Sequence, residues 1–176
     1  AYVSGIVVGG QSRLVWVGRD GKEQSLPAAP HIYQFPRVSP DGRRVVISIA
    51  EEETNNWIYD VSRDTLTRLT FEGSVNNNPA WSPDGRKIAF GSDRKGPRNL
   101  FWQAADGSGK VERLTTSETL HSANAFSPDG QLLAFIDITP DTGRDISILN
   151  VKSGKATSFL KTPNEDTAPT FSPDGK

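Results

Sequence analysis

The string Ser-Pro-Asp-Gly occurs four times in this chain, beginning at Ser39, Ser82, Ser127 and Ser172. The four aspartates of this motif are 43, 45 and 45 residues apart. A fixed period in the forties, marked by a turn between apolar segments, is typical of the blades of a β-propeller. The spacing therefore predicts an all-β propeller of four blade equivalents, each a four-stranded antiparallel sheet.

Each copy of the motif has the residues of a tight turn. Proline at the second position presets φ near about −65°, aspartate bonds to its own backbone, and glycine accepts a positive φ. An apolar residue precedes every motif serine: Val38, Trp81, Phe126 and Phe171. We therefore expect the motif to join the first two strands of each unit, with the preceding residue packed in the interior.

Short apolar runs follow the turn in three of the units. The segments 45–47, 88–90 and 132–135 are nearly continuous in apolar residues, as expected for a second strand buried on both faces. Polar, turn-rich links lead from them to predicted third strands at 57–59, 100–102 and 146–149. Fourth strands are predicted at 66–70, 111–115 and 156–160, where the alternation suits an outer strand.

The repeat divides the chain into three whole units and one split unit. The whole units cover about 31–70, 76–116 and 121–161, and the split unit combines 1–27 with 167–176. Residues 169–171 supply a predicted first strand, and the segment beginning at Ala1 resembles the tail of a second strand. We expect these ends to pair and close a single domain over residues 1–176. The alternative is part of a larger propeller, which self-associates if the ring is incomplete.

Composition excludes several classes of partner. The chain has 20 Lys and Arg against 21 Asp and Glu, so no basic field exists to hold a nucleic acid. No apolar run approaches the roughly 18 residues of a membrane span. Cysteine is absent, which rules out disulfides and thiolate metal ligands. Because the chain begins at Ala1 without methionine, we interpret it as processed or cut from a longer parent.

A resemblance to a known family covers nearly the whole chain. Residues 79–94, which read Pro-Ala-Trp-Ser-Pro-Asp-Gly-Arg-Lys-Ile-Ala-Phe-Gly-Ser-Asp-Arg, are similar to the repeat of TolB-like propellers, also called WD-like β-propeller repeats. Residues 100–102 (Leu-Phe-Trp), 113–115 (Arg-Leu-Thr) and 68–70 (Arg-Leu-Thr) fit the later part of that repeat. The opening segment 12–23 also resembles propellers attached to bacterial serine/threonine kinases.

The resemblance implies that the chain binds a partner and does not catalyse a reaction. TolB is a periplasmic protein that docks a lipoprotein on one end of its propeller, and relatives serve as gates beside serine peptidase domains. The resemblance therefore predicts a non-catalytic protein-interaction scaffold in the periplasm or another extracytoplasmic compartment. Two alternatives stay open: a sensory or gating propeller cut from a larger enzyme, either a kinase or a serine peptidase, and a propeller that binds a small ligand or an ion.

The loop that enters each predicted first strand is the candidate binding surface. Six residues before each motif serine stand Tyr33, Asn76, His121 and Asp166. This position is expected near the central channel of a propeller, so the four side chains are predicted to converge on a partner there. The alternative is a solvated funnel whose polar groups only satisfy the loop backbone. The neighbouring polar residues Asn77, Asn78, Ser122, Asn124 and Thr167 belong to the same predicted site.

Catalytic, cofactor and metal sites are not indicated. His31 and His121 are interpreted as surface histidines, because two histidines without a carboxylate set make a weak metal site. Residues 107–110 (Gly-Ser-Gly-Lys) lack the spacing and the following helix of a phosphate loop, so we expect a hairpin turn. No Gly-x-Ser-x-Gly nucleophile elbow occurs. The sequence therefore predicts a chain with no catalytic residue, cofactor or metal.

Overall fold

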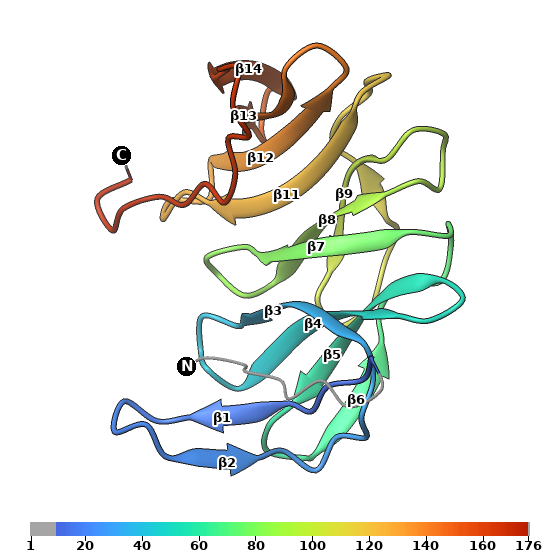
Figure 1. Cartoon of the computed structure of the whole chain (residues 1–176), viewed down its shortest axis with the longest axis vertical. Helices are drawn as coiled ribbons and strands as arrows, with labels where there is room; N and C mark the ends of the chain where they lie inside the picture. Colours follow the sequence, from blue (N-terminus) through green and yellow to red (C-terminus); the bar gives the residue numbers. More distant parts are fainter. Residues whose placement is uncertain (1–9, 176) are drawn as a thin grey trace.

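Figure 1 shows the computed structural model of the chain, which describes residues 10–175. These residues form fourteen strands and no helix, so no helix in this part of the chain is long and apolar enough to cross a membrane. The strands make three four-stranded sheets and one two-stranded sheet, and all pairs of neighbours are antiparallel. The all-β prediction is therefore confirmed.

We number the sheets along the chain. Sheet I contains β1 (Val15–Val17) and β2 (Glu23–Ser25). Sheet II contains β3 (Tyr33–Val38), β4 (Arg44–Ala50), β5 (Thr54–Asp60) and β6 (Thr65–Arg68). Sheet III contains β7 (Asn76–Trp81), β8 (Lys87–Ser92), β9 (Asn99–Ala104) and β10 (Glu112–Arg113). Sheet IV contains β11 (Leu120–Phe126), β12 (Leu132–Thr139), β13 (Gly143–Asn150) and β14 (Lys155–Leu160).

Each four-stranded sheet is a simple meander whose first strand lies at one edge. These edge strands are β3, β7 and β11, and β7 contacts both of the others. In Figure 1 they lie one above another, with the motif turn of sheet III on the left and the β8–β9 connection on the right. We call β3, β7 and β11 the inner strands, because they occupy the place of the channel-lining strands of a propeller.

Neighbouring sheets bury their apolar faces against each other, which explains the nearly continuous apolar runs in the sequence. Alternate residues of β8 point to opposite faces, so Ile88 and Phe90 pack toward sheet II while Ala89 packs toward sheet IV. In β4, Val46 packs toward sheet III. Val45 of the same strand packs in the cluster that includes Leu14. Three intersheet cores therefore take the place of one central core.

The Ser-Pro-Asp-Gly turns have the predicted structure, with a side-chain network that stabilises them. In sheet III the Ser82 hydroxyl donates to the Asp84 carboxylate at 2.6 Å and accepts from the Lys87 backbone N–H at 2.9 Å. The same hydroxyl is the main cause that lowers the pKa of Asp84. Ser39 and Ser127 make the same two contacts in their own turns.

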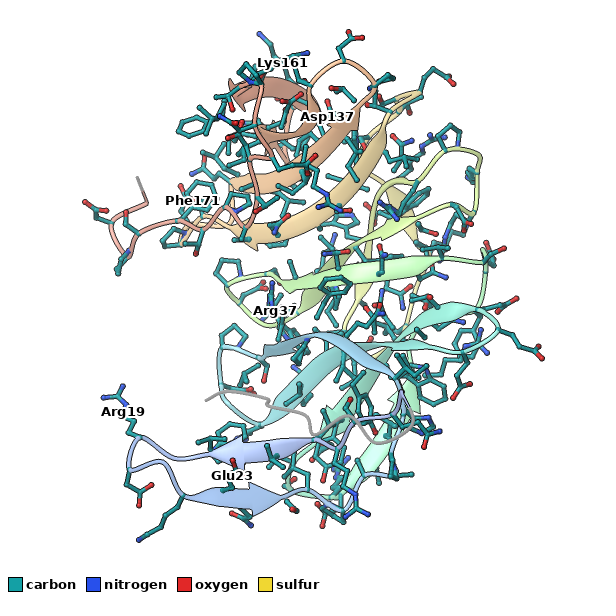
Figure 2. All side chains as sticks on the ribbon, in the orientation of Figure 1. Arg19, Glu23, Arg37, Asp137, Lys161 and Phe171 are labelled. Atoms are coloured by element: carbon teal, nitrogen blue, oxygen red, sulfur yellow. The ribbon has the colours of Figure 1, made fainter. Side chains whose placement is uncertain are left out.

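The two ends of the described chain lie apart. Residues 161–175 contain no strand, so the first strand predicted at 169–171 is not formed, although Gly175 still closes its turn onto the Ser172 carbonyl at 2.9 Å. Strands need a partner ladder, and the partner predicted near Ala1 lies outside the described residues. Figure 2 shows Phe171 beside sheet IV and Arg19 beside sheet I, at opposite ends of the array. Closure by both termini therefore stays a prediction.

Candidate functional site

The four equivalent polar positions do not converge on one surface. Asn76 is completely buried, where its amide nitrogen donates to Asn55 Oδ1 at 3.2 Å and to the Glu72 carbonyl at 2.9 Å. Arg94 donates to the Asn76 oxygen at 3.3 Å. All of the amide's hydrogen-bonding groups are therefore used between sheets II and III, and Asn76 is a structural residue.

His121 occupies the equivalent place between sheets III and IV. Only 4% of the residue is exposed, so the interpretation of His121 as a surface histidine is wrong. Its Nδ1 lies 2.8 Å from Thr115 Oγ1, and its Nε2 lies 3.5 Å from Asp137 Oδ1. Burial lowers the pKa of His121, while the Asp137 carboxylate acts in the opposite direction. The ring also packs on Phe135, with the ring centroids 4.7 Å apart.

Both residues belong to a repeated contact that we call the intersheet latch. A threonine after the fourth strand of one sheet donates to an asparagine of the third strand: Thr70 to Asn55 and Thr115 to Asn99, both at 3.1 Å. The first strand of the next sheet completes the network through Asn76 or His121. This network accounts for the polar residue six positions before the motif in sheets III and IV.

The two remaining members of the predicted set also have local partners. The Tyr33 hydroxyl donates to the Ala29 carbonyl at 2.6 Å, and burial raises the pKa of Tyr33 to about 12. The Asp166 carboxylate accepts from the backbone N–H of Thr162 at 3.1 Å and from its hydroxyl at 3.0 Å. The structure therefore leaves no surface formed jointly by these four side chains.

The neighbouring polar residues do come together. A pocket of about 440 Å³ lies where the inner strands meet the end of the array that carries the β8–β9 and β12–β13 connections. We call it the mouth pocket. The structure thus brings together five of the predicted residues from three segments: Asn77, Asn78, Ser122, Asn124 and Thr167.

A bulge in each inner strand shapes this pocket. The pairing register shifts between Gln34 and Arg37 in β3 and between Asn77 and Ala80 in β7. Phe35 and Asn78, each four residues before its motif serine, have positive φ values of 51° and 52°. Ala168, at the equivalent position before Ser172, has φ of 56°. All three left-handed residues line the mouth pocket.

Sequence reasoning missed the charged part of the pocket. Its lining includes Arg37, Arg98 and Arg144, and no Asp, Glu, Lys or His among the described lining residues. Burial is the main cause that lowers the pKa of Arg98, with Asp93 acting against it and Arg144 adding to it. Arg98 and Arg144 occupy equivalent positions of the repeat, since their carbonyls accept from the backbone N–H groups of His121 at 2.7 Å and Asp166 at 2.8 Å, each six residues before a motif serine. Arg37 comes from a different position of the repeat, so the period alone does not group the three arginines.

A second hollow of about 420 Å³ continues along the inner strands toward the motif turns. It shares Arg37, Asn124 and Ala168 with the mouth pocket, and it adds apolar residues that include Trp81 and Phe126. Figure 2 shows Arg37 between β3 and β7, at the junction of the two hollows. The inner face therefore has a polar, cationic end and an apolar end.

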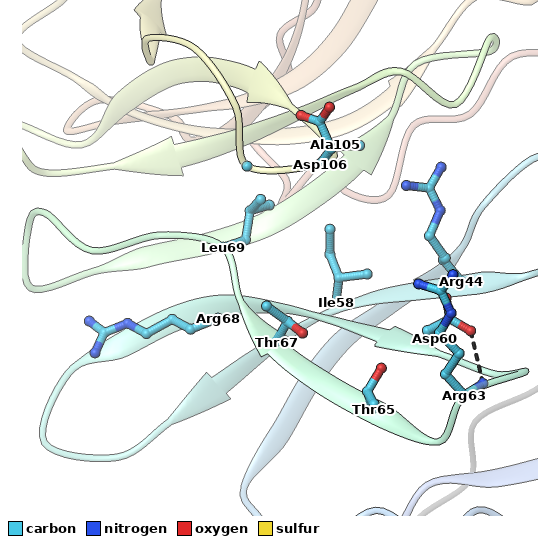
Figure 3. A pocket seen from close by; sticks show the side chains of 11 residues that line it. Arg44, Ile58, Asp60, Arg63, Thr65, Thr67, Arg68, Leu69, Ala105 and Asp106 are labelled. Carbon is cyan, nitrogen blue, oxygen red and sulfur yellow. Dashed lines mark hydrogen bonds between the residues drawn. The ribbon is translucent and has the colours of Figure 1, made fainter.

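A smaller groove of about 190 Å³ lies between the outer strands of sheet II and the turn after β9 (Figure 3). Its charges have both signs, since Arg44 and Arg63 face Asp60 and Asp106, and Asp60 accepts a hydrogen bond from the Arg63 backbone at 3.1 Å. None of the residues predicted for the binding site lies here. Among residues 10–175, no three His, Asp or Glu side chains are grouped to hold a metal ion.

Antiparallel meanders that stack face to face, with their first strands along one inner line, define a β-propeller module. A family model for the TolB beta propeller domain matches residues 19–176 of the chain. The chain therefore belongs to the TolB β-propeller domain family, as the resemblance of its repeat predicted.

Several curated proteins match parts of the chain. Uncharacterized protein Atu1656 of Agrobacterium fabrum is 38% identical over 80 residues, which are 45% of this chain and 27% of the relative. Uncharacterized peptidase YuxL of Bacillus subtilis is 32% identical over 87 residues, 46% of this chain and 13% of the relative. The Tol-Pal system protein TolB of Wolinella succinogenes is 26% identical over 95 residues, 53% of this chain and 23% of the relative. The chain thus spans a small share of each relative's length.

Solved structures share the fold. TolB from Acinetobacter baumannii superposes with a TM-score of 0.81 at 23% identity, over 94% of this chain and 41% of that one. A putative TolB from Agrobacterium tumefaciens gives 0.78 at 25% identity, over 96% of this chain and 65% of that one. Puromycin hydrolase gives 0.73 at 22% identity, over 92% and 28%. The resemblance of segment 12–23 to kinase propellers gains no support from these proteins.

Proposed function

We propose that this chain is a non-catalytic interaction module that captures a protein partner at the mouth pocket. The observation that carries the proposal is the meeting of Asn77, Asn124 and Thr167 at one hollow formed by three units of the fold. Amide and hydroxyl side chains offer both donors and acceptors to a peptide, and the pocket is open at its mouth.

The location of the pocket supports the same function. Inner strands β7 and β11 each pair on one side only within the described sheets, so their other edges face the hollow with backbone N–H and C=O groups. An extended segment of a partner can bond to such an edge. The curated relative from the Tol-Pal system favours an extracytoplasmic location, which we propose here as well.

A second candidate function is a gate or guide beside a peptidase domain. It is favoured by the 32% identity to peptidase YuxL and by the shared fold with puromycin hydrolase. The two functions predict different gene contexts. A peptidase domain encoded next to the segment for residues 1–176 would favour the gate, and its absence from the full open reading frame would favour the interaction module.

Site-specific crosslinking tests the proposed capture. A photoreactive phenylalanine analogue is placed at Phe35, which is 38% exposed and lines the mouth pocket, or at Phe159 of the outer strand β14, which is 74% exposed. We expect a discrete crosslinked product with an envelope protein of the source organism at Phe35 and none at Phe159. Adding Asn77→Ala and Asn124→Ala is expected to abolish the product.

The outcome that contradicts the proposal is equally specific. Equal crosslinking at Phe35 and Phe159, or a product at Phe35 that persists in the double asparagine variant, would mean that the mouth pocket does not select the partner. Because Asn77 and Asn124 are only partly buried, thermal unfolding of the variant serves as the check that the fold is retained.

A further inference from the structure

Three guanidinium groups line the mouth pocket from three separate parts of the fold. Arg37 belongs to inner strand β3, Arg98 precedes β9 in sheet III, and Arg144 lies at the start of β13 in sheet IV. A cluster of like charges raises the free energy of the empty site and favours an anionic ligand. Arg98 and Arg144 are equivalent residues of their units, one position before Asn99 and Asp145, and Arg37 joins them from a different position of the repeat.

The surrounding acidic groups leave part of this charge uncompensated. Arg144 pairs with Glu165, Nη1 to Oε2 at 3.3 Å, on the exposed rim. Arg37 and Arg98 have no ion pair with any other residue between 10 and 175: Arg37 donates to the Pro36 carbonyl at 3.1 Å, and Arg98 Nε donates to the His121 carbonyl at 3.3 Å. Two guanidinium groups therefore retain donors for an anion.

Arg98 is held in place for this role. Its aliphatic stem packs against Gly91, where an added Cβ would lie 3.2 Å from Cδ of Arg98 and 2.8 Å from the His121 carbonyl. A larger residue at position 91 would displace the arginine. The stem and the Nε bond fix the orientation of the guanidinium, so little side-chain entropy remains to be lost when a ligand binds.

The neutral lining selects among anions. Phe35, Ile136 and Ile138 provide apolar contacts, and Asn77 and Asn78 provide amide groups beside the arginines. A free phosphate can accept from the amide N–H groups but offers nothing to the apolar surface or to the amide oxygens, whereas a peptide offers a carboxylate, backbone N–H and C=O groups, and apolar atoms. Guanidinium groups bind carboxylates through paired, charge-assisted hydrogen bonds.

We infer that the mouth pocket is a carboxylate-binding site that recognises an acidic peptide segment through Arg37, Arg98 and Arg144. The inference rests on the proposed function, since it names the chemistry of the partner captured at this pocket. The carboxylate comes either from an Asp or Glu side chain or from the end of a chain, and the experiment separates these two sources.

The test uses capped peptides and the chain of residues 1–176. The first probe is an acetylated, amidated hexapeptide with two central aspartates among glycines, and its isostere carries asparagines instead. The second pair is an acetylated tetraglycine with a free or an amidated end. Binding is followed by NMR from the Nε–Hε signals of the arginines, and inorganic phosphate is titrated separately.

We expect an acidic probe, either the aspartate peptide or the free-ended tetraglycine, to shift the Arg98 signal while its neutral partner does not. The one that binds identifies the source of the carboxylate. Arg98→Gln and Arg37→Gln are each expected to weaken that binding by about tenfold or more, the cost of one charge-assisted hydrogen bond.

The matched control is Arg63→Gln, an exposed arginine of the β5–β6 turn outside this pocket, which is expected to leave binding unchanged. Arg37 is exposed, so its variant keeps the test valid if Arg98→Gln unfolds.

Three results would overturn the inference: equal binding of charged and neutral peptides, wild-type affinity in both arginine variants, or phosphate binding more tightly than either acidic peptide. These results are distinct from failure of the proposed function. A crosslink at Phe35 that needs Asn77 but neither arginine would refute the carboxylate site alone. Acidic peptide binding without any crosslinked envelope protein would refute the capture of a partner alone.

Discussion

The indole of Trp81 donates a hydrogen bond from Nε1 to the backbone carbonyl of Arg37 at 2.9 Å. This bond joins inner strand β7 to inner strand β3. Trp81 is only 8% exposed and packs in the core between sheets II and III. The Arg44 guanidinium lies 4.8 Å from the ring centroid and also donates to the Gly85 carbonyl at 3.0 Å. One aromatic residue therefore links apolar packing, a hydrogen bond and a cation–π contact between neighbouring sheets.

Substitution of Trp81 should separate these contributions. Trp81→Phe keeps most of the ring packing and removes the bond to Arg37, so we expect a loss of about 1 kcal/mol in the free energy of unfolding. Trp81→Ala also leaves a cavity and is expected to cost about 3–5 kcal/mol. The control is Trp102→Phe, whose indole bonds to Glu112 at the surface and should cost less than the Trp81→Phe change. Urea unfolding provides the measurement. Equal losses of unfolding free energy in Trp81→Phe and Trp102→Phe would contradict a stabilising role for the bond from Trp81 to Arg37.

Gly85 tests the backbone requirement of the motif turn. Its φ is +68°, and an added Cβ would meet nothing closer than Pro40 Cδ at 3.7 Å, so the cost of a side chain comes from the backbone alone. We expect Gly85→Ala to destabilise by about 1–2 kcal/mol and the β-branched Gly85→Val by more. Gly85→Asn should cost less than either because asparagine tolerates the left-handed region. Melting temperatures in any other order would refute the steric explanation.

His121 should make stability depend on pH. Burial lowers the pKa of His121 in the folded chain. Between the folded and the unfolded pKa, the histidine is therefore protonated in the unfolded chain and neutral in the folded chain. Stability is then fully present above the unfolded pKa of about 6.5 and is lost as pH falls toward the lowered folded pKa. His121→Asn, which introduces the residue found at position 76 in the preceding latch, should flatten this dependence. Asp137→Asn should steepen it, because the opposing carboxylate is removed; unchanged slopes in both variants would contradict the role of His121.

The repeat architecture could be predicted because its signals are local. Proline, aspartate and glycine specify the motif turn within four residues, and the apolar run after it follows from burial of β8 on both faces. Positions six residues before the motif were correctly recognised as equivalent, but their role was not. Whether His121 is a ligand contact or a buried latch depends on Thr115, which belongs to the preceding sheet. The repeated Arg-Leu-Thr at 68–70 and 113–115 contains this threonine and its equivalent Thr70, but the sequence does not show that the hydroxyl turns toward the next sheet.

The candidate site was accessible to prediction only in part. Asn77 and Asn124 were found because they neighbour the repeat positions, whereas Arg98 and Arg144 reach the mouth pocket from the start of the third strand of two different sheets. The bulge was also missed. Asn78 gave a weak signal, since asparagine tolerates positive φ, but Phe35 at the equivalent position favours an extended strand by its residue type. Tertiary structure determines the backbone there against the local preference.

Phe35 offers a direct test of whether this strained backbone serves binding. An aromatic residue at φ of 51° is held in a region that costs an L-residue roughly 1–2 kcal/mol, and the residue is 38% exposed, so its burial offsets that cost only in part. Phe35→Asn copies the residue at the equivalent position of β7. We expect this variant to be more stable by about 0.5–1 kcal/mol in urea unfolding, since asparagine tolerates the conformation at lower cost.

The same variant should capture its partner less well, because the apolar ring at the mouth pocket is lost. Phe35→Leu is the matched comparison: it keeps an apolar side chain and the strained backbone, so its stability should stay near that of the original chain and its capture should fall less. Capture is measured with the photoreactive group moved to a neighbouring lining residue, Thr167. If Phe35→Asn proved less stable, the ring would be a packing residue. If Phe35→Asn captured the partner as well as the original chain does, the strained backbone at position 35 would have no function in binding. The phenylalanine would then contribute neither to stability nor to capture of the partner.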